Sequence, residues 1–246
     1  MPLYRERAVV LRTYRLGETD RIVSLMTETR GKVRAVVKGV RKPGSRFGAR
    51  LEPTSHVALQ LYEGRNLDTV TQAESIDAFR GLRDHLDALT AAMAVLEATD
   101  QVAQEQEANG PLYRMVVGAL RTLSETPSPL VAPAFLWKLL SLEGFHPQLD
   151  ACVRCGTEVG LVAVVPEAGG AVCEACAPQS PGAEAGPALA LVSRILGGGL
   201  RSVLADDGTF ADGTGATVRE VQRLALRAVE YHFERRLRSG ALLTSA

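Results

Sequence analysis

The sequence lacks the short motifs that mark many catalytic sites. A phosphate-cradling loop, a glycine-rich dinucleotide-binding turn and a nucleophile elbow are all absent. Aromatic residues make up 5% of the chain, with one Trp, and the four histidines are dispersed. Nothing in these features supports an enzymatic activity, so we expect a protein without catalytic activity.

A long hydrophobic run is also missing. The chain begins Met-Pro-Leu-Tyr-Arg-Glu-Arg, without the basic and apolar regions of a secretory signal. No apolar run approaches the roughly 20 residues that cross a bilayer. We therefore expect no membrane partner and a cytoplasmic location, where cysteine thiols stay reduced.

Cysteine is scarce, but its spacing is specific. Two Cys-x-x-Cys pairs, with the segment 156–172 between them, comprise Cys152, Cys155, Cys173 and Cys176. Each pair can span two corners of a tetrahedron, and the separation is usual for zinc sites. Residues 161–165 read as a strand and Gly169-Gly170 as a turn, so the segment predicts a zinc-ribbon-like hairpin.

Other uses of these cysteines are open. They could form disulfides or a redox pair, or remain idle buried thiols, although two pairs at this spacing favour a metal. Four thiolates would close the coordination shell and leave no position for a substrate water. The pattern thus indicates one structural Zn²⁺ ion, to which the nearby His146 is surplus.

Net charge is zero, but the charges are unevenly distributed. Residues 1–50 hold 13 bases and four acids, and the segment 1–80 carries a net charge of +6 against −6 for the segment 81–246. A basic module on an acidic remainder is the electrostatic pattern expected for nucleic-acid contact. The alternative is an arginine-rich, solvated surface without a ligand.

The N-terminal segment 1–80 follows the two-residue period of strands. Alternation predicts strands over residues 7–14, 21–27, 32–39, 56–62 and 67–78. A basic stretch over 40–50, containing Gly and Pro, separates the third strand from the fourth. Five short antiparallel strands predict a small barrel of the OB type, whose exposed face and loops commonly hold oligonucleotides.

From about residue 81 the period becomes that of helices. Helices are expected over 81–109, from Pro111, over 134–143 with Trp137 in the core, over 189–204 and over 217–239. The first carries an apolar stripe of Leu82, Leu86, Leu89, Met93 and Leu96. Gly197-Gly198-Gly199 should weaken or kink the fourth helix, and Thr217-Val-Arg-Glu220 should cap the last.

Together these patterns predict an α+β multidomain protein. An N-terminal OB-fold β-barrel is followed by an all-helical domain that carries the four-cysteine, zinc-ribbon-like insertion. The expected segments are an OB-fold DNA-binding domain at 1–80, a first helical part at 81–149, the zinc module at 150–180 and a C-terminal helical part at 181–246.

Several segments match one family pattern. They are Gly17-Glu-Thr-Asp-Arg-Ile-Val-Ser-Leu-Met-Thr27, Gly31, Val36-Val-Lys-Gly-Val-Arg-Lys42, Arg46, Leu51-Glu-Pro53, Gly144-Phe-His-Pro-Gln-Leu-Asp150 and the two cysteine pairs. With them the chain resembles the RecO family of bacterial recombinational repair proteins over nearly its whole length. The resemblance is loosest in the two final helices.

The resemblance implies a mediator of DNA repair and homologous recombination in the RecF pathway. Such proteins bind single- and double-stranded DNA and anneal complementary strands. With RecR, they load RecA onto DNA coated by single-strand-binding protein. The implied partners are DNA, RecR and the C-terminal tail of single-strand-binding protein, with functional links to RecA and RecF and a place at the nucleoid.

The expected DNA-binding residues lie in the basic module and are Arg12, Arg34, Lys38, Arg41, Lys42, Arg46, Phe47 and Arg50. Their cations would contact phosphates with little sequence preference. Phe47 is the best candidate for stacking on a base, and packing into the barrel is its alternative.

Two other functions fit the residue pattern. One is a zinc-ribbon accessory factor in transcription or translation that binds nucleic acid but does not anneal strands. The other is a zinc nuclease or hydrolase, which would need an open coordination position and a general base nearby.

Overall fold

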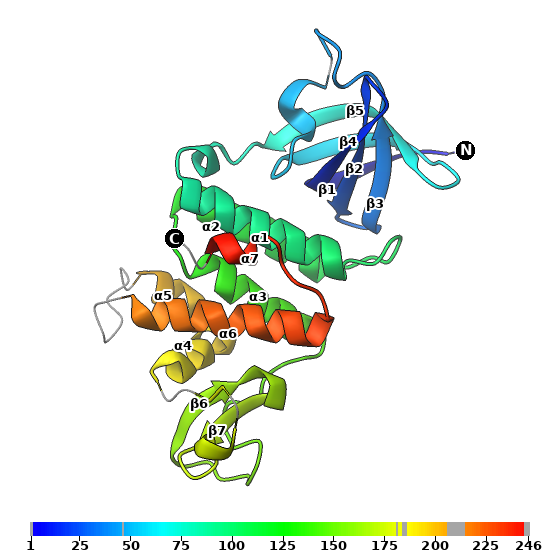
Figure 1. Cartoon of the computed structure of the whole chain (residues 1–246). Coiled ribbons are helices and arrows are strands. Elements are labelled where there is room, and N and C mark those ends of the chain that lie inside the picture. Colours follow the sequence, from blue (N-terminus) through cyan, green and yellow to red (C-terminus); the bar gives the residue numbers. More distant parts are fainter. Residues whose placement is uncertain (1, 46, 181, 184–185, 206–214, 244–246) are drawn as a thin grey trace. The chain divides into compact units, whose positions relative to one another are not determined.

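The computed structural model describes residues 2–45, 47–180, 182–183, 186–205 and 215–243. The chain divides into two compact units, Met1–Pro127 and Ser128–Ala246. The first unit holds the barrel and two helices, and the second holds the cysteine hairpin and the remaining helices (Figure 1). Whether the four segments expected from the sequence are separate domains stays a prediction.

Five strands form a closed barrel at the N-terminus, which confirms the OB-like fold expected (Figure 1). They are β1 (Leu3–Leu16), β2 (Asp20–Thr27), β3 (Gly31–Val37), β4 (His56–Tyr62) and β5 (Asp68–Asp77). The order around the barrel is β1-β2-β3-β5-β4, and all pairs are antiparallel except β3 with β5. The ranges of β2, β3, β4 and β5 agree closely with those expected, whereas β1 runs from Leu3 to Leu16 and exceeds the expected 7–14 at both ends.

The alternation places one face of each strand in the barrel core. In β3, Val33, Ala35 and Val37 are buried while Arg34 is exposed. The cluster that fills the barrel consists of Ala8, Val10, Val23, Leu25, Val33, Ala35, Val37, Phe47, Leu51, Val57, Leu59, Leu61 and Val70. Small and branched side chains suit the narrow interior of a five-stranded barrel, because little volume is available there.

The helical stripe expected from residue 82 is wrong in part. A short 3-10 turn, η2 (Arg80–Arg83), precedes α1 (Leu86–Val102), and the Leu86 side chain is 78% exposed. The buried residues of α1 are mostly alanines, among them Ala91, Ala92 and Ala98. A search for large apolar residues misses such a face, because alanine packs closely without a bulky side chain.

The second helix, α2 (Gly110–Glu125), begins as its sequence predicts. The Asn109 side chain accepts a hydrogen bond from the Leu112 N–H at 3.0 Å, and Pro111 occupies the first turn. Leu112, Val116 and Leu120 are buried on one face. Both α1 and α2 contact β1 within the first unit.

His56 of β4 is buried between the barrel and α2. Its Nε2 lies 2.7 Å from the Tyr113 hydroxyl, and its ring stacks on Phe79. Burial lowers the pKa of His56 below its ordinary value, because the charged form would lose water. Folding therefore favours the neutral imidazole.

We expect this burial to make the first unit less stable in mild acid. As pH falls below about 6.5, His56 binds a proton in the unfolded chain but stays neutral in the folded protein. The free energy of unfolding should then fall by at most about 1.4 kcal/mol per pH unit, down to the lowered pKa of the folded state. Urea unfolding of the wild type and of His56→Gln across pH 5–8 measures this slope. Equal slopes in the two proteins would contradict the assignment.

The second unit begins with α3 (Val131–Leu142), which starts before the expected residue 134 and includes Pro133 in its first turn. Trp137 is 1% exposed, which confirms its core role. The hairpin follows as β6 (Leu161–Val165), η3 (Pro166–Ala168) and β7 (Gly170–Cys173), and then η4 (Ala177–Gln179). The expected strand and turn are both confirmed.

The remaining helices are α4 (Ala188–Arg194), a π segment η5 (Ile195–Gly199), α5 (Leu200–Ala205), α6 (Ala216–Phe233) and α7 (Gly240–Leu243). The kink expected at the glycines is confirmed, because Gly198 has a φ of 88°. The capping box is wrong: Gly215 precedes the first residue of α6, so Thr217 lies inside the helix. This helix also ends at Phe233, before the expected position.

One stretch of the described chain, Ala188–Ala205, is long and apolar enough to cross a membrane by length and composition alone. The expectation that no apolar run approaches the length of a membrane span is therefore wrong for this stretch. The stretch is weak support for a membrane segment, since core helices of water-soluble proteins pass the same test, and the left-handed Gly198 interrupts its helix.

Candidate metal centre and nucleic-acid surface

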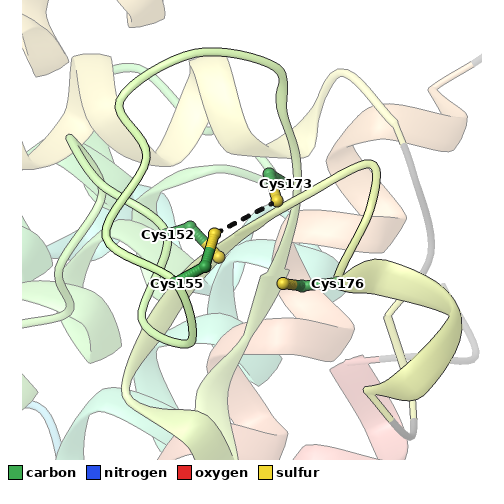
Figure 2. A group of neighbouring side chains, drawn as sticks. All are labelled: Cys152, Cys155, Cys173 and Cys176. Carbon is green, nitrogen blue, oxygen red and sulfur yellow. Dashed lines mark hydrogen bonds between the residues drawn. The ribbon is translucent and has the colours of Figure 1, made fainter.

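The two cysteine pairs converge at one end of the hairpin (Figure 2). All four sulfur atoms lie within 4.8 Å of one another, and Cys155 Sγ is 3.7 Å from Cys173 Sγ. Two thiolates on a tetrahedral zinc ion would stand about 3.8 Å apart, given Zn–S bonds of about 2.3 Å. The donor set thus fits a four-coordinate thiophilic metal ion.

Backbone hydrogen bonds hold each pair in a tight turn. The Gly156 N–H donates to the Cys152 carbonyl at 2.9 Å, and the Cys176 N–H donates to the Cys173 carbonyl at 3.0 Å. Gly156 has a φ of 77°, in the left-handed region where a side chain would be strained. The turn therefore depends on the glycine that follows the first pair.

The thiols ionise unequally in the absence of a metal ion. Burial raises the pKa of the Cys152 thiol, but backbone N–H groups of Cys155, Cys173 and Arg154 outweigh burial and lower it to about 6. Hydrogen bonds to Cys173 and Cys155 raise the pKa of Cys176 to about 12. The negative charge of Cys152 adds to this effect, so ionisation of one thiol disfavours ionisation of the next. A bound dication would remove that repulsion.

His146 does not belong to this cluster. Its Nδ1 lies 2.8 Å from the Ser141 hydroxyl, and the group that could hold a metal comprises the four cysteines. That His146 is surplus to the ligand set stays a prediction, with which this contact is consistent.

Two of the expected DNA-binding residues lie in one row across the barrel. Arg12 of β1 pairs with Ser24 of β2, which in turn pairs with Arg34 of β3. Both arginines are near acids: Arg12 Nη1 is 3.8 Å from Asp100, and Arg34 Nη1 is 3.8 Å from Glu105. The two arginine side chains are 43% and 44% exposed, so the pairs are weak in water.

Lys38, Arg41 and Lys42 lie in what we call the basic loop, residues 38–50. All three are exposed. Arg50 is exposed near the end of the loop, in η1 (Gly48–Leu51). Arg46 lies outside the described residues.

The start of the basic loop is attached to the β1–β2 turn. The Asp20 carboxylate accepts a hydrogen bond from the Gly39 N–H at 2.8 Å, which lowers the pKa of Asp20. The Arg41 backbone N–H donates to the Thr19 carbonyl at 2.9 Å, and its guanidinium donates to the Glu18 carbonyl at 2.9 Å. These contacts give the motif Gly17-Glu-Thr-Asp20 a structural purpose, which is to position the loop.

Phe47 does not form a stacking surface. Its side chain is 3% exposed and belongs to the barrel core, so the prediction that it contacts DNA is wrong.

Tyr14, which the sequence patterns did not single out, is better placed to stack on a base. Its side chain is 42% exposed, and the Arg12 guanidinium lies 5.7 Å from its ring centroid.

Replacement of Phe47 by Ala is expected to destabilise the first unit rather than to weaken DNA binding selectively. Removal of a buried Phe side chain costs about 3–5 kcal/mol. Urea unfolding measures this loss, and Tyr14→Ala is the matched control, because an exposed ring should cost little stability. A Phe47→Ala protein as stable as the wild type would contradict the core assignment.

Comparison with known families explains this combination of parts. The family model for the N-terminal part of recombination protein O matches residues 1–79, and the model for its C-terminal part matches residues 83–241. The chain belongs to the RecO family. The resemblance found in the sequence motifs is therefore confirmed, and it covers both compact units.

Two RecO relatives align with the chain over nearly its whole length. A protein named DNA repair protein RecO from a Nocardioides species is 43% identical over 247 residues, which cover 97% of this chain and 98% of the relative. A protein of the same name from Cutibacterium acnes is 41% identical over 252 residues, with 99% of both covered. These relatives are named as repair proteins, and the chain is a member of this DNA repair family.

Proposed function

We propose that the chain binds single- and double-stranded DNA through the basic side of its barrel and anneals complementary strands. The observation that carries this proposal is the grouping of cations on β1, β3 and the basic loop. Arg12, Arg34, Lys38, Arg41, Lys42 and Arg50 all lie on the outside of the barrel. Arg46 belongs to the same stretch of sequence.

Phosphate contact should dominate this binding. Each Arg or Lys that neutralises a phosphate releases counterions, so affinity should fall steeply with salt and depend little on sequence. Stacking contributes about 1–3 kcal/mol per base, and Tyr14 is one exposed ring on this surface. A protein that holds strands by their backbones leaves the bases free to pair, which suits annealing.

The RecO family supports a wider role in recombination. We propose that the chain acts with RecR to load RecA onto DNA coated by single-strand-binding protein, through contact with that protein's C-terminal tail and in functional linkage with RecF. This role needs no bond chemistry, and it places the chain in the cytoplasm, at the nucleoid and away from membranes.

The metal in this proposal is one structural Zn²⁺ ion. Cys152, Cys155, Cys173 and Cys176 would hold it, and a closed shell of four thiolates supplies no open position for a reaction. Its contribution would be to stabilise the hairpin. Glu167 in the hairpin turn already accepts hydrogen bonds from the Arg227 guanidinium of α6 at 2.9 and 3.1 Å, so the hairpin is attached to the last long helix.

Fluorescence anisotropy with labelled oligonucleotides tests the DNA-binding proposal. Several single-stranded DNA sequences, one DNA duplex and one RNA strand are titrated at roughly 50, 100 and 200 mM salt, a range over which phosphate contacts weaken strongly. We expect similar affinities for all the single strands and a linear fall of log affinity with log salt. Affinity that depends on base sequence but not on salt would contradict the proposal. Binding to RNA alone would favour an accessory factor in translation.

A further inference from the structure

A hollow of about 290 Å³ opens on the first unit beside the start of β3. Its walls come from β3, from the turn between β4 and β5, and from the segment that follows α1. The charged side chains that line it are Arg30, Lys32, Arg34, Arg65, Glu63, Asp68 and Glu105. Four basic and three acidic residues therefore border one small volume, although the Lys32 ammonium donates to the Asp100 carbonyl at 2.7 Å.

The segment after α1 is attached to β3 by its backbone. We call residues 103–107 the strap. The Lys32 N–H donates to the Gln104 carbonyl at 3.0 Å, and the Gln106 N–H donates to the Lys32 carbonyl at 3.1 Å. The approach is so close that a Cβ at Gly31, which has a φ of 66°, would lie 1.8 Å from the Glu107 carbonyl oxygen. The strap thus has a fixed position over the strand.

Two of the acids in the hollow already have partners that limit their reach. Asp68 accepts a hydrogen bond from the Tyr4 hydroxyl and another from the Gly64 N–H at 2.9 Å. Glu63 lies 3.9 Å from Arg30, whose guanidinium also sits over the Tyr4 ring at 4.0 Å. These two acids therefore help to shape the wall of the hollow.

Glu105 differs from the other acids because its contact is with a candidate DNA-binding residue. Its carboxylate is 3.8 Å from Arg34, and its side chain is 54% exposed. An exposed ion pair of this kind is weak in water. Arg65 is exposed, and within the described parts of the chain no ion pair to it is found. A second anion could contact Arg65 and Arg34 together by displacing one weakly held carboxylate.

We propose that this hollow binds a phosphodiester group of a nucleic-acid strand, and that Glu105 competes with the phosphate for Arg34. In the free protein the strap carboxylate neutralises part of the hollow. A bound strand would turn Glu105 toward solvent and place its phosphate between Arg34 and Arg65. The inference rests on the proposed function, because it extends the DNA surface of the barrel from the basic loop to the strap.

Two substitutions on the strap provide the test and its control. Glu105→Gln removes the competing charge, whereas Glu107→Gln removes the same charge two positions away, from a side chain without an ion pair in the described structure. Anisotropy with a labelled oligothymidine measures affinity of the full chain for DNA. We expect Glu105→Gln to bind about two- to fivefold more tightly than the wild type and Glu107→Gln to bind like the wild type. Equal affinities of the two variants would overturn the competition.

Arg65→Ala tests the hollow itself. The loss of one phosphate contact should lower the slope of log affinity against log salt by about 0.7 for single-stranded DNA. An unchanged slope would overturn the assignment of the hollow. If substitution of the basic loop lowers affinity while Arg65→Ala and Glu105→Gln bind DNA like the wild type, the inference fails and the proposed function stands. If none of these variants changes DNA binding, the proposed function fails as well.

A test with inorganic phosphate shows whether the ligand of the hollow is a nucleic-acid strand or a free anion. Thermal unfolding is followed with phosphate and with chloride at equal ionic strength, for the wild type and for Arg65→Ala. Because phosphate is excluded from protein surfaces in general, we expect it to raise the melting temperature by the same amount in both proteins. A stabilisation specific to phosphate that Arg65→Ala abolishes would show a site for the free anion and overturn the proposal. Urea unfolding of each variant verifies that the exposed substitutions leave the fold intact.

Discussion

Replacement of Cys155 or Cys173 by Ser is expected to abolish metal binding and to unfold the hairpin. The four sulfurs lie within 4.8 Å of one another, so the loss of one removes a corner of the tetrahedron. Apparent binding free energies of structural zinc in small peptides are about 10–16 kcal/mol. The fully buried cluster of the hairpin is small, since it contains Ala163, Val165 and Val172 besides two of the cysteines, and the side chains packed against it are only partly buried. The metal should therefore supply much of the hairpin's stability.

Metal analysis of protein purified under reducing conditions measures this effect. We expect about one zinc ion per chain in the wild type, as for a closed four-thiolate site. His146→Ala is the matched control, because this neighbouring side chain contacts Ser141 instead of the sulfurs, and it should retain the metal. Full zinc content in Cys155→Ser, or less than one zinc ion in two wild-type chains, would contradict the assignment.

Removal of three positive charges from the basic loop is expected to have the second large effect. In Arg41→Ala/Lys42→Ala/Arg46→Ala, the slope of log affinity against log salt for single-stranded DNA should fall by about 2, since each phosphate contact contributes about 0.7. The same relation gives a loss of affinity on the order of a hundredfold at about 0.1 M salt. Arg41 and Lys42 are exposed at the start of the loop that Asp20 positions.

A control variant that loses the same charge elsewhere distinguishes this local effect from a general change in the electrostatic potential of the protein. Arg83, Arg114 and Arg121 are exposed in the helical part of the same unit, so their joint replacement by Ala removes the same charge elsewhere. We expect that variant to keep most of the affinity and the slope. If both triple variants lose affinity equally, the loop is not the binding surface. An unchanged loop variant would contradict the assignment outright.

The sequence predicted the barrel well because each strand places alternate side chains in the barrel core. Val33, Ala35 and Val37 had to point inward together, and Arg34 outward. The cysteine hairpin was predictable for a different reason, since four thiolates around one ion require a fixed spacing. In both cases a local pattern carries the information about the three-dimensional structure.

Elsewhere the deciding contacts come from distant parts of the chain. A bulge between Val10 and Arg12 reverses the alternation of β1, so Arg12 and Tyr14 face outward although Val10 faces the core. Without the bulge, the side chains of Arg12 and Tyr14 would point into the core on the same face as Val10. Phe47, in a basic and glycine-rich stretch, packs into the barrel because the loop folds back over it.

The helices show the same limit of local reasoning. Leu86 continues an apolar stripe but is exposed, while alanines form the buried face of α1. The Arg34–Glu105 contact joins a strand of the barrel to the strap, far apart in the sequence, and no local pattern indicates it. The hollow beside β3 could therefore be found only from the structure.

The most direct test of the central claim is the annealing of complementary strands coated with single-strand-binding protein, followed by fluorescence. We expect the wild-type chain to accelerate annealing, the basic-loop variant to lose most of that acceleration, and His146→Ala to keep it. DNA binding by the wild type without any acceleration of annealing would contradict the account and favour a nucleic-acid-binding accessory factor.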